Sequence, residues 1–169
     1  HPLLRNANTF SGLIPVEHVR DTVYIDLRES PEKIWTDRLE GRTRNAIRKA
    51  EKSGVCVQYS HGERITCFMD LYCETMQRLE ADAYYYFTEA YFQYLGKLVD
   101  RSAILIEAVY ESRVIASIVL LKGDKFSHYH LSASDPAFRR LQANSLLLWK
   151  AVEWSQDQGL SLMHLGGGY

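Results

Sequence analysis

The sequence lacks long apolar runs and has almost no net charge. Its longest predominantly apolar stretch, residues 114–121, is far shorter than the ~20 residues that cross a membrane, so we expect no membrane-spanning helix. Lys and Arg number 20 against 21 Asp and Glu, which leaves a net charge of −1. No global field therefore draws the chain to nucleic acid or to a membrane, and either partner would need a local patch.

Cysteine is scarce as well, and no secretion signal is visible. The three cysteines, Cys56, Cys67 and Cys73, are an odd number and show no metal-binding spacing. We interpret all three as reduced thiols, which favours a cytoplasmic protein.

The length of 169 residues fits one domain, and the 46% apolar content suffices for an ordinary core. Residues 1–21 show no periodicity and are predicted to be an irregular arm or linker. Residues 22–169 form the predicted domain. The chain stops in a glycine run after a strand, and such a run normally leads onward, so we expect a fragment of a longer protein.

Hydrophobic periodicity predicts an alternation of strands and helices. The predicted strands are 22–27, 55–59, 103–110, 113–121, 126–134 and 160–165, and the predicted helices are 31–39, 42–53, 63–81, 89–99 and 142–158. The strands at 103–110 and 113–121 form a hairpin across Glu111 and Ser112, and a further turn leads into the strand at 126–134. This order predicts a mixed α/β (α+β) fold with three consecutive antiparallel strands.

The stretch 126–159 organises the rest of the chain, because it reads strand, loop and helix in succession. Its strand alternates, with Phe126, His128, His130 and Ser132 on one face and Ser127, Tyr129, Leu131 and Ala133 on the other. Asp135 and Pro136 signal the turn, and Gly159 stands where a helix C-cap belongs.

The loop before that helix is the predicted ligand site. A helix start offers free backbone N–H groups and the positive end of the helix dipole. We therefore expect an anionic or carbonyl-bearing ligand there. The geometry requires the strands at 126–134 and 160–165 to part just ahead of the helix.

The order of elements resembles the GNAT acyltransferase superfamily, whose fourth strand feeds a loop and helix that bind the pyrophosphate of acyl-CoA. The superfamily loop reads Gln/Arg-x-x-Gly-x-Gly/Ala. The corresponding segment here is Arg140-Leu141-Gln142-Ala143-Asn144-Ser145, with Ala143 and Ser145 at the two small-residue positions.

Further stretches resemble the Fem-type branch, the peptidoglycan bridge-forming aminoacyltransferases. They are residues 43–55, 129–135, 143–151 and 164–168, and the likeness extends over residues 22–169. The resemblance implies a mainly antiparallel sheet flanked by helices, in a chain that lacks the further helix and closing β-hairpin of that branch. It also implies a tandem domain or a homodimer as partner.

The activity implied by this resemblance is N-acyl transfer to an amine by direct attack, without a covalent enzyme intermediate. The donor would be acyl-CoA or aminoacyl-tRNA, with no tightly bound cofactor, and the acceptor a small molecule or a muropeptide. Two alternatives remain open: a CoA-dependent acetyltransferase of small amines, and a non-catalytic half of a tandem protein.

Residues with binding roles fall into two groups. The donor group is Arg139, Arg140, Gln142, Ala143 and Asn144, against the alternative of an ordinary loop with arginines in water. The acceptor or phosphate group is Arg44, Arg48 and Lys49, because guanidinium matches phosphate bidentately, together with Tyr85 and Tyr86 of an aromatic loop. A solvated helix face and simple packing are the respective alternatives.

The chemistry requires a base for the attacking amine and donors for the tetrahedral oxyanion. The candidate bases are Glu107, His130 and Asp135, and Tyr129 is the candidate donor to the leaving group. Glu107 interrupts an apolar strand, so we expect either an edge position or a buried carboxyl with a raised pKa. A structural role is the alternative for each. Three imidazoles, of His128, His130 and His164, suggest zinc, but no recognised spacing completes such a site, and we assign no metal.

Overall fold

The computed structural model of the chain describes residues 12–15, 17 and 21–167. Within these residues one sheet holds six strands in the order β1-β6-β5-β4-β3-β2. The strands are β1 (Thr22–Asp26), β2 (Cys56–Ser60), β3 (Ala103–Tyr110), β4 (Arg113–Lys122), β5 (Phe126–Ser134) and β6 (Leu162–Gly167). Only β5 and β6 pair in parallel; the other neighbours are antiparallel. The predicted mixed, mainly antiparallel sheet is confirmed.

Helices connect and cover these strands. They are α2 (Pro31–Lys33), α3 (Gly41–Lys52), α4 (Ile65–Arg78), α5 (Glu89–Leu98) and α6 (Ala143–Asp157). Shorter turns are η1 (Ile34–Arg38), a π-helical turn, and the 3₁₀ segments η2 (Gly62–Arg64), η3 (Ala83–Tyr85) and η4 (Pro136–Leu141). The predicted helix 31–39 is therefore wrong in detail, because one α-helical turn gives way to the π-helical one. Most of the predicted arm lies outside the described residues.

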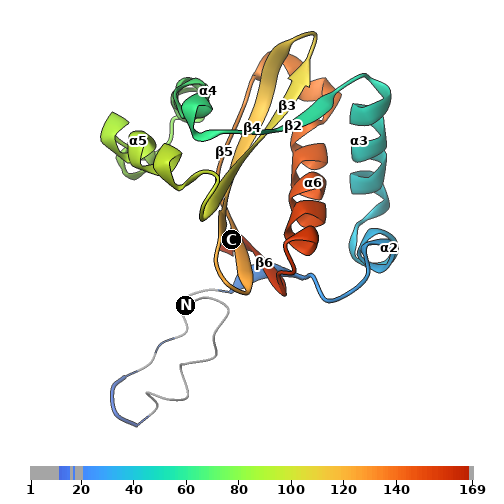
Figure 1. The fold of residues 1–169 in the computed structure, drawn as a ribbon, viewed down its shortest axis with the longest axis vertical. Helices are drawn as coiled ribbons and strands as arrows, with labels where there is room; N and C mark the ends of the chain where they lie inside the picture. Colours follow the sequence, from blue (N-terminus) through green and yellow to red (C-terminus); the bar gives the residue numbers. More distant parts are fainter. Residues whose placement is uncertain (1–11, 16, 18–20, 168–169) are drawn as a thin grey trace.

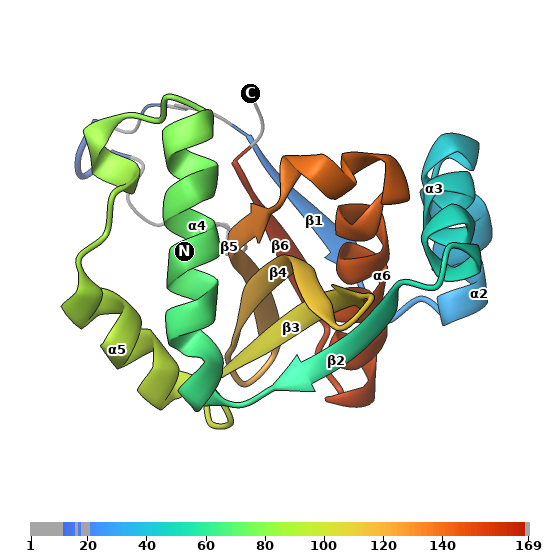
Figure 2. The ribbon, with the colours of Figure 1, turned by 90° about the horizontal axis from the view of Figure 1, so that it is seen from above.

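The helices form a layer on each side of the sheet (Figures 1 and 2). One layer holds α3 and α6, whose Ile47 and Leu147 share a buried cluster with Ile118 of β4. The other holds α4 and α5, whose buried side chains include Phe68 and Phe92. Because successive strand residues point to opposite faces, each central strand supplies both cores. No helix in the described part of the chain is long and apolar enough to cross a membrane.

A β-bulge interrupts the alternation of β5 at His130. Val119 of β4 pairs with Leu131, but the next residue of β4, Leu120, pairs with Tyr129, so His130 is an extra residue. Leu131 packs in the core beneath α4 and α5, whereas Tyr129 packs against the core beneath α6. The predicted common face of Tyr129 and Leu131 is therefore wrong, because one inserted residue reverses the side-chain alternation.

The parallel pair of β5 and β6 is short. It joins Phe126 to Leu162, Ser127 to Met163 and His128 to His164. Beyond His128, β5 continues along β4, while β6 continues along β1. We call the region beyond these two histidines, where β5 and β6 are no longer paired, the fork. The parting of these strands was expected from the sequence and is present.

Candidate functional site

The start of α6 leaves backbone donors without intrahelical acceptors. Gln142, the residue before the helix, has a left-handed backbone with φ 61° and ψ 29°, and no side chain caps the helix. The Ser145 N–H donates to the Gln142 carbonyl at 3.1 Å. The N–H groups of Ala143 and Asn144 precede the first intrahelical bonds and are oriented outward with the positive end of the helix dipole.

A small cavity opens at this point, between the end of β5, η4 and the start of α6. Its volume is about 110 Å³, room for roughly four water molecules. The lining includes Ile115, Ser134, Arg139, Gln142, Ala143 and Asn144. Four of the five predicted donor-binding residues therefore meet at this helix-start cavity, and Arg140 stands exposed beside them.

Asp135 is fully engaged in holding the loop together. Its Oδ2 atom lies 2.6 Å from Arg113 Nη2, and its Oδ1 atom accepts the Ala137 N–H at 2.9 Å. The side chain therefore caps η4 and joins it to the strand β4. With both oxygens occupied by these contacts, this carboxylate supports the cavity wall.

His130 of β5 contacts a tyrosine of the layer that holds α4 and α5. The Tyr91 hydroxyl of α5 lies 2.5 Å from His130 Nε2, and the Phe87 ring stacks on Tyr91 with centroids 4.4 Å apart. Burial raises the pKa of Tyr91 and lowers the pKa of His130. Both groups are therefore neutral, and the Tyr91 phenol donates a hydrogen bond to the His130 imidazole. The sequence did not single out Tyr91, because nothing in a helical stripe shows which residue meets a strand 39 positions later.

His128 and His164 form a second pair, at the base of the fork. Their Nδ1 atoms are 2.6 Å apart and their rings stack at 4.7 Å. Burial, together with the neighbouring His164 and His130, lowers the pKa of His128 to about 4. His164 is buried, and its Nε2 atom has no hydrogen-bond partner in the described part of the chain. The described part of the chain contains no group of three or more His, Cys, Asp or Glu arranged to hold a metal ion.

Glu107 is fully buried and paired. It accepts hydrogen bonds from Arg64 Nε at 2.7 Å, from Gln58 Nε2 at 2.8 Å and from the Ser60 hydroxyl. Burial raises the pKa of this carboxyl, but the hydrogen bonds from Arg64, Ser60 and Gln58 outweigh burial, so the pKa lies below its usual value. The expected raised pKa is therefore wrong, and the paired carboxylate is a structural feature of β2, β3 and η2.

Tyr129, the predicted donor to the leaving group, faces away from His130. Its ring packs against the core beneath α6, and burial raises the pKa of its phenol. The structure therefore does not bring Tyr129 together with the Tyr91–His130 pair.

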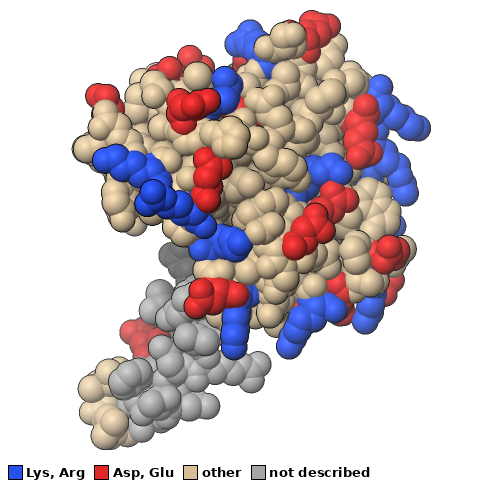
Figure 3. All heavy atoms as spheres, in the orientation of Figure 1, with Lys and Arg blue, Asp and Glu red and all other residues tan. Residues whose placement is uncertain are grey.

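The basic residues of α3 are partly committed to their own layer. Arg44 Nη1 donates to the carbonyls of Trp35, Thr36 and Leu39, which closes the end of η1. Arg48 lies over the Trp35 ring at 5.4 Å from its centroid. Lys49 is exposed on the last turns of α3. On the face seen in Figure 3, basic and acidic side chains are interspersed, without a patch of one sign.

The aromatic loop lies between α4 and α5, on the side of the sheet that holds the Tyr91–His130 pair. Tyr85 and Tyr86 are about half exposed, and the Tyr85 carbonyl accepts the Tyr72 hydroxyl at 3.0 Å. The loop thus continues into the Phe87–Tyr91 stack. The backbone is fixed here while two phenol rings remain available to a ligand.

Comparison with known proteins identifies the domain type. The family model described as an acetyltransferase (GNAT) domain matches residues 38–169. No curated protein matches the chain significantly.

Solved structures share the fold at low sequence identity. FemX superposes with a TM-score of 0.76 at 14% identity, over 92% of this chain and 55% of its own. The C-terminal domain of a putative lysylphosphatidylglycerol synthetase from Agrobacterium fabrum gives 0.64 at 12%, over 87% and 46%. A ribosomal-protein-alanine N-acetyltransferase from Brucella melitensis gives 0.51 at 13%, over 63% and 75%. The chain therefore spans about half the length of FemX.

Proposed function

Because the chain belongs to the GNAT acetyltransferase domain family, we propose that it is an N-acyltransferase that moves an acyl or aminoacyl group from a carrier to an amine at the fork. The observation that carries this proposal is the parting of β5 and β6 after His128 and His164, beside the uncapped start of α6. The backbone N–H groups without intrahelical acceptors at the start of α6 suit an anionic carrier or an activated carbonyl.

The donor lies with its anionic carrier at the helix-start cavity. The N–H groups of Ala143 and Asn144 bind phosphate oxygens, as helix starts do elsewhere. Arg139 lines the same cavity and adds a charged donor. Donor binding therefore depends on backbone geometry more than on any single side chain.

The Tyr91–His130 pair removes the proton from the attacking amine. As the amine nitrogen forms its bond to the acyl carbon, Tyr91 accepts the amine proton and passes its own to His130 Nε2. The bond from the acyl carbon to the carrier sulfur or oxygen breaks, and the carrier leaves as a thiol or alcohol with the returned proton. No covalent enzyme intermediate forms, so the free cysteines have no part in the reaction.

The Fem-type branch supplies the preferred reading of donor and acceptor. The likeness to FemX extends over 92% of this chain, against 63% for the N-acetyltransferase. An aminoacyl-tRNA donor and a muropeptide acceptor therefore stand first, with acetyl-CoA and a small amine second. A non-catalytic half-domain is the outcome that a complete lack of turnover would favour.

The test is turnover by the intact, full-length protein with each donor and acceptor pair. We expect Tyr91→Phe and His130→Phe to lower kcat about 10²- to 10⁴-fold, the usual range for loss of a general base. Tyr94→Phe is the matched control, since this phenol is exposed on the same helix. Binding of neither aminoacyl-tRNA nor acetyl-CoA by the intact protein would overturn the proposal.

A further inference from the structure

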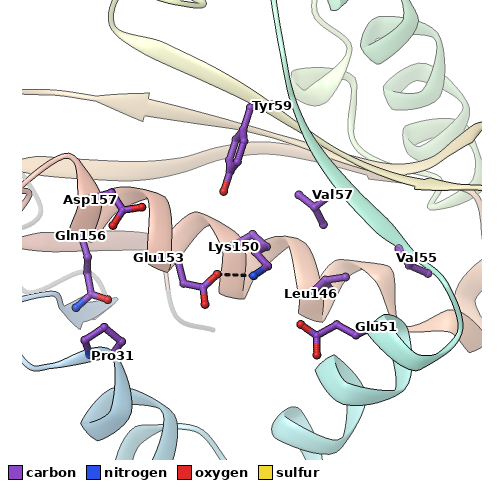
Figure 4. Close-up of a pocket in the computed structure, with 10 residues that line it drawn as sticks. All are labelled: Pro31, Glu51, Val55, Val57, Tyr59, Leu146, Lys150, Glu153, Gln156 and Asp157. Carbon is purple, nitrogen blue, oxygen red and sulfur yellow. Dashed lines mark hydrogen bonds and ion pairs between the residues drawn. The ribbon is translucent and has the colours of Figure 1, made fainter.

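A second hollow lies between the edge strand β2, the end of α3 and α6 (Figure 4), and shares no lining residue with the helix-start cavity. Its volume is about 570 Å³, within the roughly 300–1,000 Å³ of small-molecule sites. Strands β3 and β4 separate β2 from β5 in the sheet. This outer hollow, lined by residues of β2, α3 and α6, is therefore distinct from the proposed transfer site.

One side of the outer hollow is apolar. Val57 and Tyr59 lie on the face of β2 that looks toward α6, and Leu146 of α6 lies across from them. The alternate residues of β2, Gln58 and Ser60, turn to the opposite face and bind Glu107. An alkyl chain or another apolar body is the ligand portion that this wall fits.

The charged lining is predominantly acidic. It comprises the carboxylates of Glu51, Glu153 and Asp157 and the ammonium of Lys150, a net charge of −2 from three negative groups and one positive. Lys150 and Glu153 pair at 2.6 Å and largely neutralise each other. Neither Glu51 nor Asp157 forms an ion pair within the described part of the chain. Figure 4 shows these two carboxylates at opposite ends of the hollow.

Gln156 adds an acceptor that lacks a donor, at the Asp157 end. Its Nε2 atom donates to the carbonyls of Leu27 at 3.1 Å and Glu29 at 2.8 Å, so the orientation of the amide is fixed. Its Oε1 atom is buried and has no hydrogen-bond partner among the described residues. A buried acceptor left unpaired costs free energy, which an N–H donor of a ligand would recover.

We propose that the outer hollow binds a short aliphatic diamine. One ammonium group pairs with Glu51 and the other with Asp157, where it also donates to Gln156 Oε1. The methylene chain lies on Val57 and Leu146. The net negative lining repels anionic ligands such as the acyl carriers.

The test is binding of α,ω-diaminoalkanes of four to eight carbons by calorimetry, with the monoamine and the alcohol of equal length as probes. We expect the best diamine to bind about two- to fivefold more tightly than its monoamine, since one exposed ion pair contributes up to about 1 kcal/mol. The alcohol should bind least. Added salt should weaken diamine binding because both carboxylates are exposed to solvent.

Variants locate the site. Glu51→Gln and Asp157→Asn should each lower diamine affinity about two- to fivefold, to that of the monoamine. Both side chains are exposed, so neither change threatens folding. Glu74→Gln, an equal charge change on the exposed face of α4, is the control and should leave affinity unchanged. Methyl resonances of Val57 and Leu146 should shift on binding, and those of Leu131 should not.

The proposal is overturned if the alcohol binds as tightly as the diamine, or if Glu74→Gln weakens binding as much as Glu51→Gln and Asp157→Asn do. Absence of binding at millimolar diamine would also overturn it. Because binding is measured directly, these outcomes are independent of whether the fork transfers an acyl group.

Discussion

His128 and His164 face each other through their Nδ1 atoms, 2.6 Å apart, at the last paired positions of β5 and β6. In such a contact one neutral imidazole donates its Nδ1–H to the Nδ1 atom of the other, and protonation of the accepting nitrogen would break this hydrogen bond and place a cation in a largely buried site. The base of the fork is therefore most stable when both histidines are neutral, and the stability of the protein depends on pH.

Acidification should destabilise the protein through this pair. The pKa of His128 falls from 6.5 to about 4 on folding, so the unfolded chain binds protons more readily between these values. The stabilisation is present above pH 6.5 and is lost as the pH falls toward 4. We expect roughly 1–2 kcal/mol, below the full linkage value because the ring is only partly buried. Urea unfolding at pH 7.5 and pH 5 measures it.

The variant His128→Gln isolates this contribution, because glutamine cannot take up the proton. Its free energy of unfolding should fall less between pH 7.5 and pH 5 than that of the unaltered protein. The variant His61→Gln, which removes an exposed histidine outside this pair, is the control for the change of residue type. Equal losses in all three proteins would contradict the account of this pair.

The rate of transfer should rise with pH through the pKa of His130. Burial lowers this pKa, so the imidazole is already neutral below its ordinary value of 6.5. A plot of kcat/KM against pH should therefore rise through a midpoint below pH 6.5 and level off above that midpoint. A rise centred well above pH 7 would speak against His130 as the base.

The buried Glu107 supports the fold, and its substitution should affect stability. Arg64→Met leaves a buried carboxylate with its main partner removed, so we expect a loss of about 2–3 kcal/mol in the free energy of unfolding. The kcat of the folded protein should change little. The double variant Arg64→Met with Glu107→Met should recover part of the stability. A large loss of kcat with unchanged stability would instead place Glu107 in the chemistry.

Two glycines let η2, the turn before α4, approach α5. A Cβ atom on Gly62 would lie 2.1 Å from the Gly96 carbonyl oxygen, a backbone atom that cannot rotate away. Gly62→Ala should therefore destabilise the protein by about 1–3 kcal/mol, the usual cost of overpacking. Gly123→Ala is the control, because its Cβ atom would meet nothing closer than 3.5 Å. Equal melting temperatures for the two variants would contradict this packing.

Substitution of Ala143 and Ser145, the two small residues at the start of α6, tests which acyl donor the protein binds. If the helix-start cavity binds a pyrophosphate, Ala143→Gly with Ser145→Gly should tighten acetyl-CoA binding, because the backbone can approach the phosphates more closely. Calorimetry measures this. Unchanged affinity would count against acetyl-CoA and favour the aminoacyl donor.

Much of the fold could be predicted because local patterns determine it. Glu111 and Ser112 form the expected two-residue turn, with φ of 47° and 63°, between two alternating strands. Gly54 and Gly159 have the positive φ expected of residues that follow helices. The parting of β5 and β6 also follows from the strand, loop and helix order.

What the sequence could not predict depends on contacts between distant residues. The bulge at His130 adds one residue to β5 without any mark in the sequence, so the alternation of side chains was extended wrongly. Arg64 lies 43 residues before Glu107, and its effect on the carboxyl pKa appears only when η2 reaches β3. The hydrogen bonds from Arg44 to the carbonyls of Trp35, Thr36 and Leu39 were not predicted either, because they depend on the π-helical geometry of η1.

The central claim is that the backbone N–H groups at the start of α6 bind the acyl donor substrate at the fork. Amide resonances of Ala143 and Asn144 in ¹⁵N-labelled, full-length protein test it, in titrations with acetyl-CoA and with aminoacyl-tRNA. The account predicts saturable shifts of these two amides with one of the donors, while the amides of Glu51 and Asp157 stay in place. Saturable binding that leaves Ala143 and Asn144 unshifted, or no binding of either donor, would contradict it.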